Sequence, residues 1–151
     1  MNWLRSALLG GVFVSLCGAQ KVDIYSAQDL QKMGDALQPK GPVSAAKDLP
    51  RYQGHYLLLA KRVETGSSEL HEHDADIFVI ESGDAQIVTG GKIVGGKTSG
   101  PGEIRGRSVE GGARHELHAG DVIHIPAGVA HQLILEKGKP FVYFVVKVSG
   151  Q

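Results

Sequence analysis

The chain has 151 residues, enough for one domain with a sizeable hydrophobic core and too few for two. It carries 16 basic and 16 acidic side chains, so no net charge favours a nucleic acid or an anionic membrane surface as its partner. The 21 glycines, about twice the usual share, indicate many turns and short elements rather than long helices.

The first twenty residues have the layout of a secretory signal. One basic residue, Arg5, precedes an uncharged and mainly apolar run over 6–16, and small residues follow at 17–19. This pattern predicts a signal peptide over residues 1–19, cleavage after Ala19, and an exported protein that is periplasmic or extracellular. The apolar run is too short for a permanent membrane span.

Two alternatives for this segment stay open. One is a buried core helix, and the other is a lipoprotein anchored at Cys17, although Leu16 is larger than the small residue that usually precedes such a cysteine. Without lipidation, no membrane attachment is expected of the mature form. Cleavage after Ala19 also leaves no cysteine for a disulfide or a thiol nucleophile.

Residues 20–50 are predicted to form an N-terminal extension with one short helix. Ser26 is the expected N-cap, with Asp29 three residues later. An apolar stripe with helical spacing follows at Leu30, Met33 and Leu37. We expect this helix to pack on the outside of the main domain.

From residue 51 onward the apolar pattern changes to period two, which is typical of β-strands. The runs are short, rich in β-branched and aromatic residues, and separated by Gly, Pro, Ser or Asp. The predicted strands are 56–60, 77–80, 85–88, 121–125, 132–135 and 141–146. Because no helical segment lies between them, residues 51–151 are predicted to form an antiparallel sandwich or barrel.

Residues 90–112 hold nine of the 21 glycines. Four apolar side chains in this stretch must be shielded from water: Ile93, Val94, Ile104 and Val109. We therefore interpret it as an elaborated hairpin or loop between two strands, near the mouth of the barrel, rather than as a disordered linker.

Three of the seven histidines form a candidate metal site. His71 and His73 are two residues apart, so in one extended strand both imidazoles face the same side and can reach one ion. Residues 120–131 read glycine, five residues, proline, one residue, glycine, two residues, histidine. That pattern predicts a strand, a tight turn and a second strand that begins with His131 at the height of the other two.

These two segments resemble the motifs of the cupin superfamily. The second motif of that family, G(x)5PxG(x)2H(x)3N, matches residues 120–131, and Leu135 stands at the position of the terminal asparagine. The first motif, G(x)5HxH(x)3–4E(x)6G, matches with four residues instead of five between Gly66 and His71. Counting back from Gly83 aligns Asp76 with the glutamate of the motif.

The resemblance implies an all-β fold, a cupin-type jelly roll or double-stranded β-barrel that binds one divalent transition metal ion. The implied ligands are His71, His73 and His131, with Asp76 as the fourth ligand and Asp74 as its competitor. This donor set suits Mn, Fe, Co, Ni, Cu or Zn, among which the sequence does not choose. The alternative is a metal-free cupin whose histidines line a pocket.

Two functional classes follow. The first is a metal-dependent enzyme (an isomerase, lyase or oxygenase) whose partner is a small-molecule substrate. The second is a non-catalytic binding or sensing barrel that uses the same ion to hold a ligand. The resemblance also implies a homodimer. Glu64 and Tyr143 are further candidate pocket residues, with a structural role favoured for both.

Overall fold

A computed structural model describes two ranges of the chain, residues 22–39 and 44–151. The predicted signal peptide over residues 1–19, and Cys17 within it, lie outside the described residues. Within those two ranges, no helix combines the length and the hydrophobicity that a membrane span needs.

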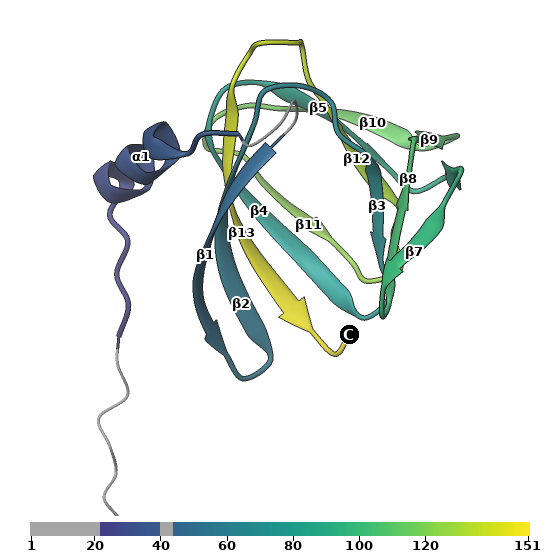
Figure 1. Cartoon of the computed structure of the whole chain (residues 1–151), viewed down its shortest axis with the longest axis horizontal. Coiled ribbons are helices and arrows are strands. Elements are labelled where there is room, and N and C mark those ends of the chain that lie inside the picture. Colours follow the sequence, from purple (N-terminus) through teal and green to yellow (C-terminus); the bar gives the residue numbers. More distant parts are fainter. Residues whose placement is uncertain (1–21, 40–43) are drawn as a thin grey trace, which may run out of the picture.

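Helix α1 (Ala27–Ala36) begins where the sequence predicts. The hydroxyl oxygen of Ser26 caps it by accepting a hydrogen bond from the backbone N–H of Asp29 at 3.1 Å. The helix lies against the outside of the barrel (Figure 1). At Gly34 a Cβ would lie 2.9 Å from Cγ1 of Val142, so the absence of a side chain there allows the helix to pack closely on the sheet.

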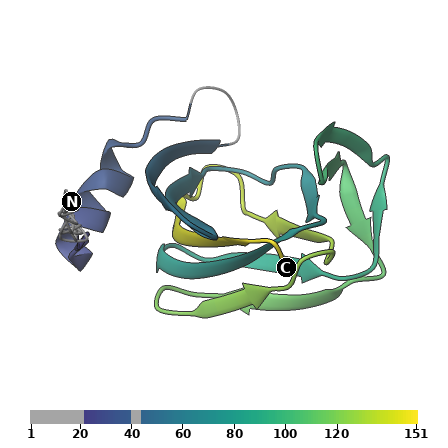
Figure 2. The ribbon, with the colours of Figure 1, turned by 90° about the horizontal axis from the view of Figure 1, so that it is seen from below.

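Two antiparallel sheets face each other and form the barrel (Figure 1, Figure 2). The first sheet has the order β1 (Ser44–Tyr52), β2 (His55–Arg62), β13 (Phe141–Ser149), β4 (Asp74–Ser82) and β11 (Val122–Ile125). The second has the order β10 (Ala113–Leu117), β5 (Ala85–Thr89), β12 (His131–Ile134), β3 (Ser68–His71), β8 (Glu103–Gly106) and β7 (Lys97–Gly100). Strands β6 (Lys92–Val94) and β9 (Ser108–Glu110) pair with each other.

Each of the six predicted strands overlaps one of these strands, and the prediction of an all-β jelly roll is confirmed. The hydrophobic core lies between the two sheets because alternate side chains of facing strands point inward. Its largest fully buried side chains are Phe141, Leu59, Ile80 and Ile87. Strand β1 already pairs with β2 from Ser44 onward, so the sheet begins inside the stretch predicted as an extension.

The glycine-rich stretch 90–112 contains β6, β7, β8 and β9 and so is more ordered than the predicted loop. Strand β8 pairs with β3 along its whole length and thereby belongs to the second sheet. These strands lie on the side of the barrel opposite α1 (Figure 2). The insertion therefore extends a wall of the barrel beside the segment that carries His71.

Two glycines with the same backbone conformation provide a matched test of this packing. Gly83, between β4 and β5, has φ +83°, and Gly54, between β1 and β2, has φ +82°. A Cβ at Gly83 would overlap the carbonyl oxygen of Pro140, whereas a Cβ at Gly54 meets no described atom within 4 Å. We expect Gly54→Ala to lower the free energy of unfolding by about 1–2 kcal/mol, the cost of a left-handed alanine. Gly83→Ala should lower it further, because the chain before β13 must also move.

Chemical denaturation of the two variants measures the difference. Equal losses would mean that the contact with Pro140 does not constrain the β4–β5 turn.

Candidate metal centre

Strand β3 brings Glu69 and His71 to the inner face of the barrel. Residues two apart in a strand share a face, and β3 ends at His71. The inward pair is therefore Glu69 and His71 rather than His71 and His73. His73 lies in the turn before β4, where its side chain is 74% exposed. The structure does not bring His73 to the other predicted ligands.

His131 is the first residue of β12 and lies directly opposite Glu69 in the register of β12 and β3. Its imidazole is buried, and its Nδ1 lies 3.0 Å from the backbone oxygen of Val129. Because a carbonyl can only accept a hydrogen bond, Nδ1 carries the proton. The lone pair of the neutral ring is then on Nε2, on the side of His71 and Glu69.

His71 is oriented in the same way by its neighbour across the β3–β8 pair. Its Nδ1 lies 2.7 Å from Oε1 of Glu103, a carboxylate oxygen that accepts a hydrogen bond from the ring N–H. Within the described part of the chain, the Nε2 atoms of His71 and His131 are buried and have no hydrogen-bond partner. Buried polar atoms are rarely left unpaired, so these two nitrogens point to a ligand that both can bind.

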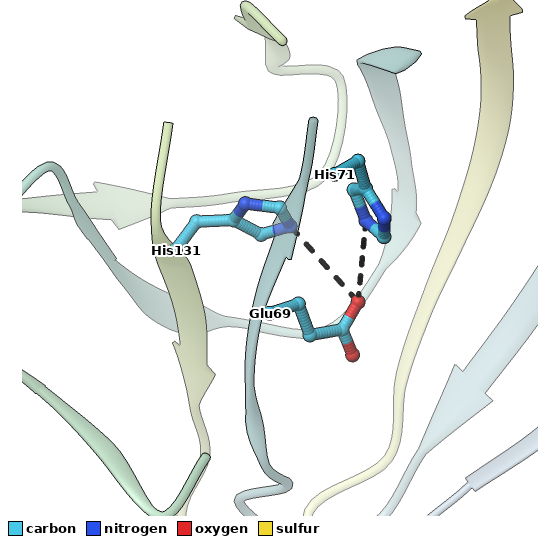
Figure 3. Close-up of side chains that lie close together, drawn as sticks. All are labelled: Glu69, His71 and His131. Atoms are coloured by element: carbon cyan, nitrogen blue, oxygen red, sulfur yellow. Dashed lines mark ion pairs between the residues drawn. The ribbon is translucent and has the colours of Figure 1, made fainter. Parts of the chain in front are cut away.

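Two carboxylate oxygens face the same two nitrogens. Oε2 of Glu69 lies 3.7 Å from Nε2 of His71 and 4.0 Å from Nε2 of His131 (Figure 3). Oδ2 of Asp76 lies 3.2 Å and 3.6 Å from those nitrogens. Ligand atoms about 2.1 Å from one metal ion are separated by about 3.0–3.4 Å when they are neighbours in its coordination sphere.

These donors fit a borderline divalent ion, because two neutral imidazoles and one or two carboxylates are its usual ligands. The ligand atoms of Glu69, His71 and His131 all lie within 4.8 Å of one another. Asp76, in β4, faces the two imidazoles. Asp74 is the first residue of that strand and pairs with Ser149. Of the predicted ligands, the structure therefore brings together His71, His131 and Asp76, and it adds Glu69.

Each of these carboxylates holds a cation with its other oxygen. Oε1 of Glu69 accepts a hydrogen bond from Nη2 of Arg62 at 2.8 Å and lies 2.5 Å from Nη1 of Arg105. Oδ1 of Asp76 lies 2.8 Å from Nζ of Lys147, its partner in the register of β4 and β13. Both carboxylates are thus fixed in orientation, with one oxygen left for the histidines.

The same neighbours control the protonation of the cluster. Burial raises the pKa of Glu69, but Arg105 and Arg62 outweigh it and lower the pKa below the usual value. Burial likewise raises the pKa of Asp76, and His71 and Lys147 reverse the shift, so both acids stay ionised. Burial lowers the pKa of His131 and keeps its imidazole neutral. For His71 burial also lowers the pKa, but its carboxylate neighbours, Asp76 first, outweigh burial and raise it.

A cavity of about 500 Å³ opens beside the cluster, between β1, β2, β13 and β8. Tyr143, one of the two candidate pocket residues, lines it and accepts a hydrogen bond from Nε of Arg62 at 2.9 Å. Glu64 is not among the residues that line it. The cavity gives a small molecule access to His71, Glu69 and Asp76.

Sequence reasoning missed five charged residues of this site: Arg62, Glu69, Glu103, Arg105 and Lys147. One local signal was available, because Glu69 precedes His71 by two residues in the same apolar-polar pattern. The other four carry no local signal. Arg62 reaches Glu69 from β2, and the other three are cross-strand neighbours, Glu103 and Arg105 beside β3 and Lys147 beside Asp76.

Comparisons with known proteins agree with this architecture. Residues 101–147 match the model of the cupin domain family. Among solved structures, a protein with a double-stranded beta-helix domain from Klebsiella pneumoniae aligns with a TM-score of 0.58 at 16% identity, over 87% of this chain and 93% of that chain. KdgF from Halomonas sp. aligns with a TM-score of 0.53 at 13% identity, over 76% and 88%.

A proposed mannose-6-phosphate isomerase from Ralstonia eutropha aligns with a TM-score of 0.53 at 17% identity, over 76% of this chain and 93% of that chain. At these identities the likeness shows the fold alone. No curated protein sequence matches the chain significantly.

The structure places Glu69, instead of the predicted His73, among the candidate metal ligands, and variants of the two residues test this difference. We expect Glu69→Gln to weaken metal binding by more than about 100-fold, beyond the 10–100-fold typical of an outer-shell partner, because it removes a charged ligand. His73→Ala and the exposed neighbour Glu72→Gln should bind metal like the wild type. Competition with a chromophoric chelator measures all three. A loss of binding in His73→Ala, with Glu69→Gln unchanged, would reverse the assignment.

Proposed function

Because the chain has a cupin-type fold and residues 101–147 match the cupin domain family, we propose that it is a metal-dependent enzyme that acts on a small molecule in the cavity lined by His71. One observation carries the proposal. The two buried Nε2 atoms lack hydrogen-bond partners in the described ranges, their rings are held by bonds at Nδ1, and carboxylate oxygens face them. A divalent ion bound between the two Nε2 atoms would satisfy both buried nitrogens and pair with the carboxylates that face them.

In this proposal His71, His131 and Glu69 hold the ion, with Asp76 as the fourth ligand. A divalent ion with so few protein ligands keeps open positions and supplies Lewis-acid chemistry to a bound substrate oxygen or water. The ring N–H groups remain with Glu103 and Val129, which fix the direction of the imidazoles. Arg62 and Lys147 hold the two carboxylates in place.

The cavity itself supports a small-molecule substrate. Its volume of about 500 Å³ lies within the range of ordinary ligand pockets. Apolar side chains from Leu58, Phe78 and Val145 form part of its wall, beside the charged groups. An isomerase, a lyase and an oxygenase all use such a combination of an open ion and a partly apolar wall.

A specific observation favours a second candidate, a non-catalytic binding or sensing barrel. Each carboxylate that lines the cavity within the described residues pairs with a cation: Glu69 with Arg62, Asp76 with Lys147 and Glu103 with Arg105. Burial raises the pKa of Tyr143, whose hydroxyl accepts a hydrogen bond from Arg62. These groups are poorly placed to take a proton from a substrate, which suits a site that only binds.

The metal itself is tested by elemental analysis of the purified chain. We expect about one equivalent of a transition metal in the wild type and almost none in His131→Ala, because a buried ligand is lost. The exposed His115→Ala is the matched control and should keep its metal. Circular dichroism checks that each variant is folded. A wild type that takes up no metal after reconstitution would refute the metal site and leave a metal-free binding barrel.

Turnover separates the two candidates. The metal-loaded wild type and His131→Ala are incubated with sugars, hydroxy acids and aromatic compounds, and the mixtures are followed by NMR. Conversion by the wild type alone supports the enzyme. Ligands that bind to the loaded protein and are never converted support the binding barrel.

A further inference from the structure

The cavity beside the metal centre is unusually rich in paired charges. Six charged side chains line it, three cationic and three anionic: Arg62, Arg105, Lys147, Glu69, Asp76 and Glu103. With both imidazoles neutral, as metal binding requires, these charges cancel. The chain's own residues therefore contribute no net charge to the cavity when an ion is bound.

A divalent ion on the histidines and Glu69 changes this balance. It adds two positive charges to a partly buried space in which every acid already has a cationic partner. A charge that is removed from water without a partner is unfavourable. A negatively charged ligand that enters from the open side of the cavity would offset the charge of the ion. The loaded cavity is thus electrostatically suited to a ligand with about two negative charges.

Arg105 is the cation that such a ligand meets first. Its side chain is 38% exposed, compared with 14% for Arg62 and 9% for Lys147. Arg62 is held between Tyr143 and Glu69, and Lys147 is held against Asp76. A guanidinium has five N–H donors, so Arg105 retains donors beyond those directed at Glu69 and Glu103.

We propose that the cavity binds a small organic oxyanion, a carboxylate or a phosphate ester, and that Arg105 contacts it. This inference rests on the proposed function, because the charge of the bound ion creates the need for an anion. It adds the chemical class of the ligand and names the residue that selects it. The planar, forked guanidinium suits both oxyanions, since each offers two oxygens at the matching spacing.

Three probes distinguish the ligand class on the metal-loaded wild type. Malonate is a dicarboxylate, inorganic phosphate represents the phosphate group, and malonamide is the neutral counterpart of malonate. Isothermal titration calorimetry measures each affinity, and the metal content of every sample is determined after the titration. We expect malonate or phosphate to bind at least about tenfold more tightly than malonamide, as expected for one charge-assisted hydrogen bond. Preference for malonate indicates a carboxylate, and preference for phosphate indicates a phosphate ester.

Two arginines of similar sequence position provide the matched variants. Arg105→Gln should weaken anion binding by about tenfold or more, the effect of losing one charged donor, whereas Arg105→Lys keeps the charge and should lose less. Arg107→Gln removes the same charge from an exposed side chain outside this cavity and should change the affinity by less than about twofold. Affinities are compared per metal-loaded protein.

Two outcomes overturn the inference and leave the metal site intact. One is a loaded wild type that binds neither malonate nor phosphate more tightly than malonamide, which needs no variant. The other is an Arg105→Gln variant that behaves like Arg107→Gln. A wild type without metal overturns the proposed function and, with it, the inference, and the metal determination identifies that case separately.

Discussion

The position of Glu69 between two strands determines what the centre of the barrel can bind. Strand β3 lies between β12 and β8, and their registers place Glu69 opposite His131 on one side and opposite Arg105 on the other. One carboxylate oxygen consequently faces the imidazoles while the other holds the arginines. A shift of β3 by one residue would turn Glu69 and His71 to the outer face of the sheet and remove both sets of contacts.

The other charges of the site follow the same rule of cross-strand pairing. Asp76 lies opposite Lys147, and His71 lies opposite Glu103, so each buried charge has a partner fixed by the backbone. Removing charged groups from water is unfavourable unless such partners are in place. The pairing keeps both acids ionised and leaves the two Nε2 atoms directed inward. A site arranged in this way would need little rearrangement to bind the proposed ion.

The glycine-rich insertion contributes to both the candidate metal centre and the cavity beside it. Strand β8 lies within this stretch and contributes Glu103, which orients His71, and Arg105, which holds Glu69 at the open side of the cavity. Glycines allow the close approach of this strand: a Cβ at Gly106 would overlap Cγ2 of Ile93. A segment with the composition of a loop therefore forms part of the wall of the cavity.

Local signals in the sequence were sufficient for the start of α1 and for six of the strands, but not for β1 or for the four strands inside the glycine-rich insertion. The period-two runs predicted the main strands, and Ser26 with Asp29 predicted the start of α1, because both depend on neighbours within a few residues. The spacing of residues 120–131 likewise predicted a turn before His131. The residue at which β3 ends, by contrast, is not determined by its neighbours in the sequence. The backbone N–H of Glu72 bonds to the carbonyl oxygen of Gly102 in the insertion, directly after the end of β3, and His73 beyond it is exposed. Arg105 and Lys147 reach the site only through strand register, which pairs residues far apart in the chain and is decided by the packing of the whole barrel.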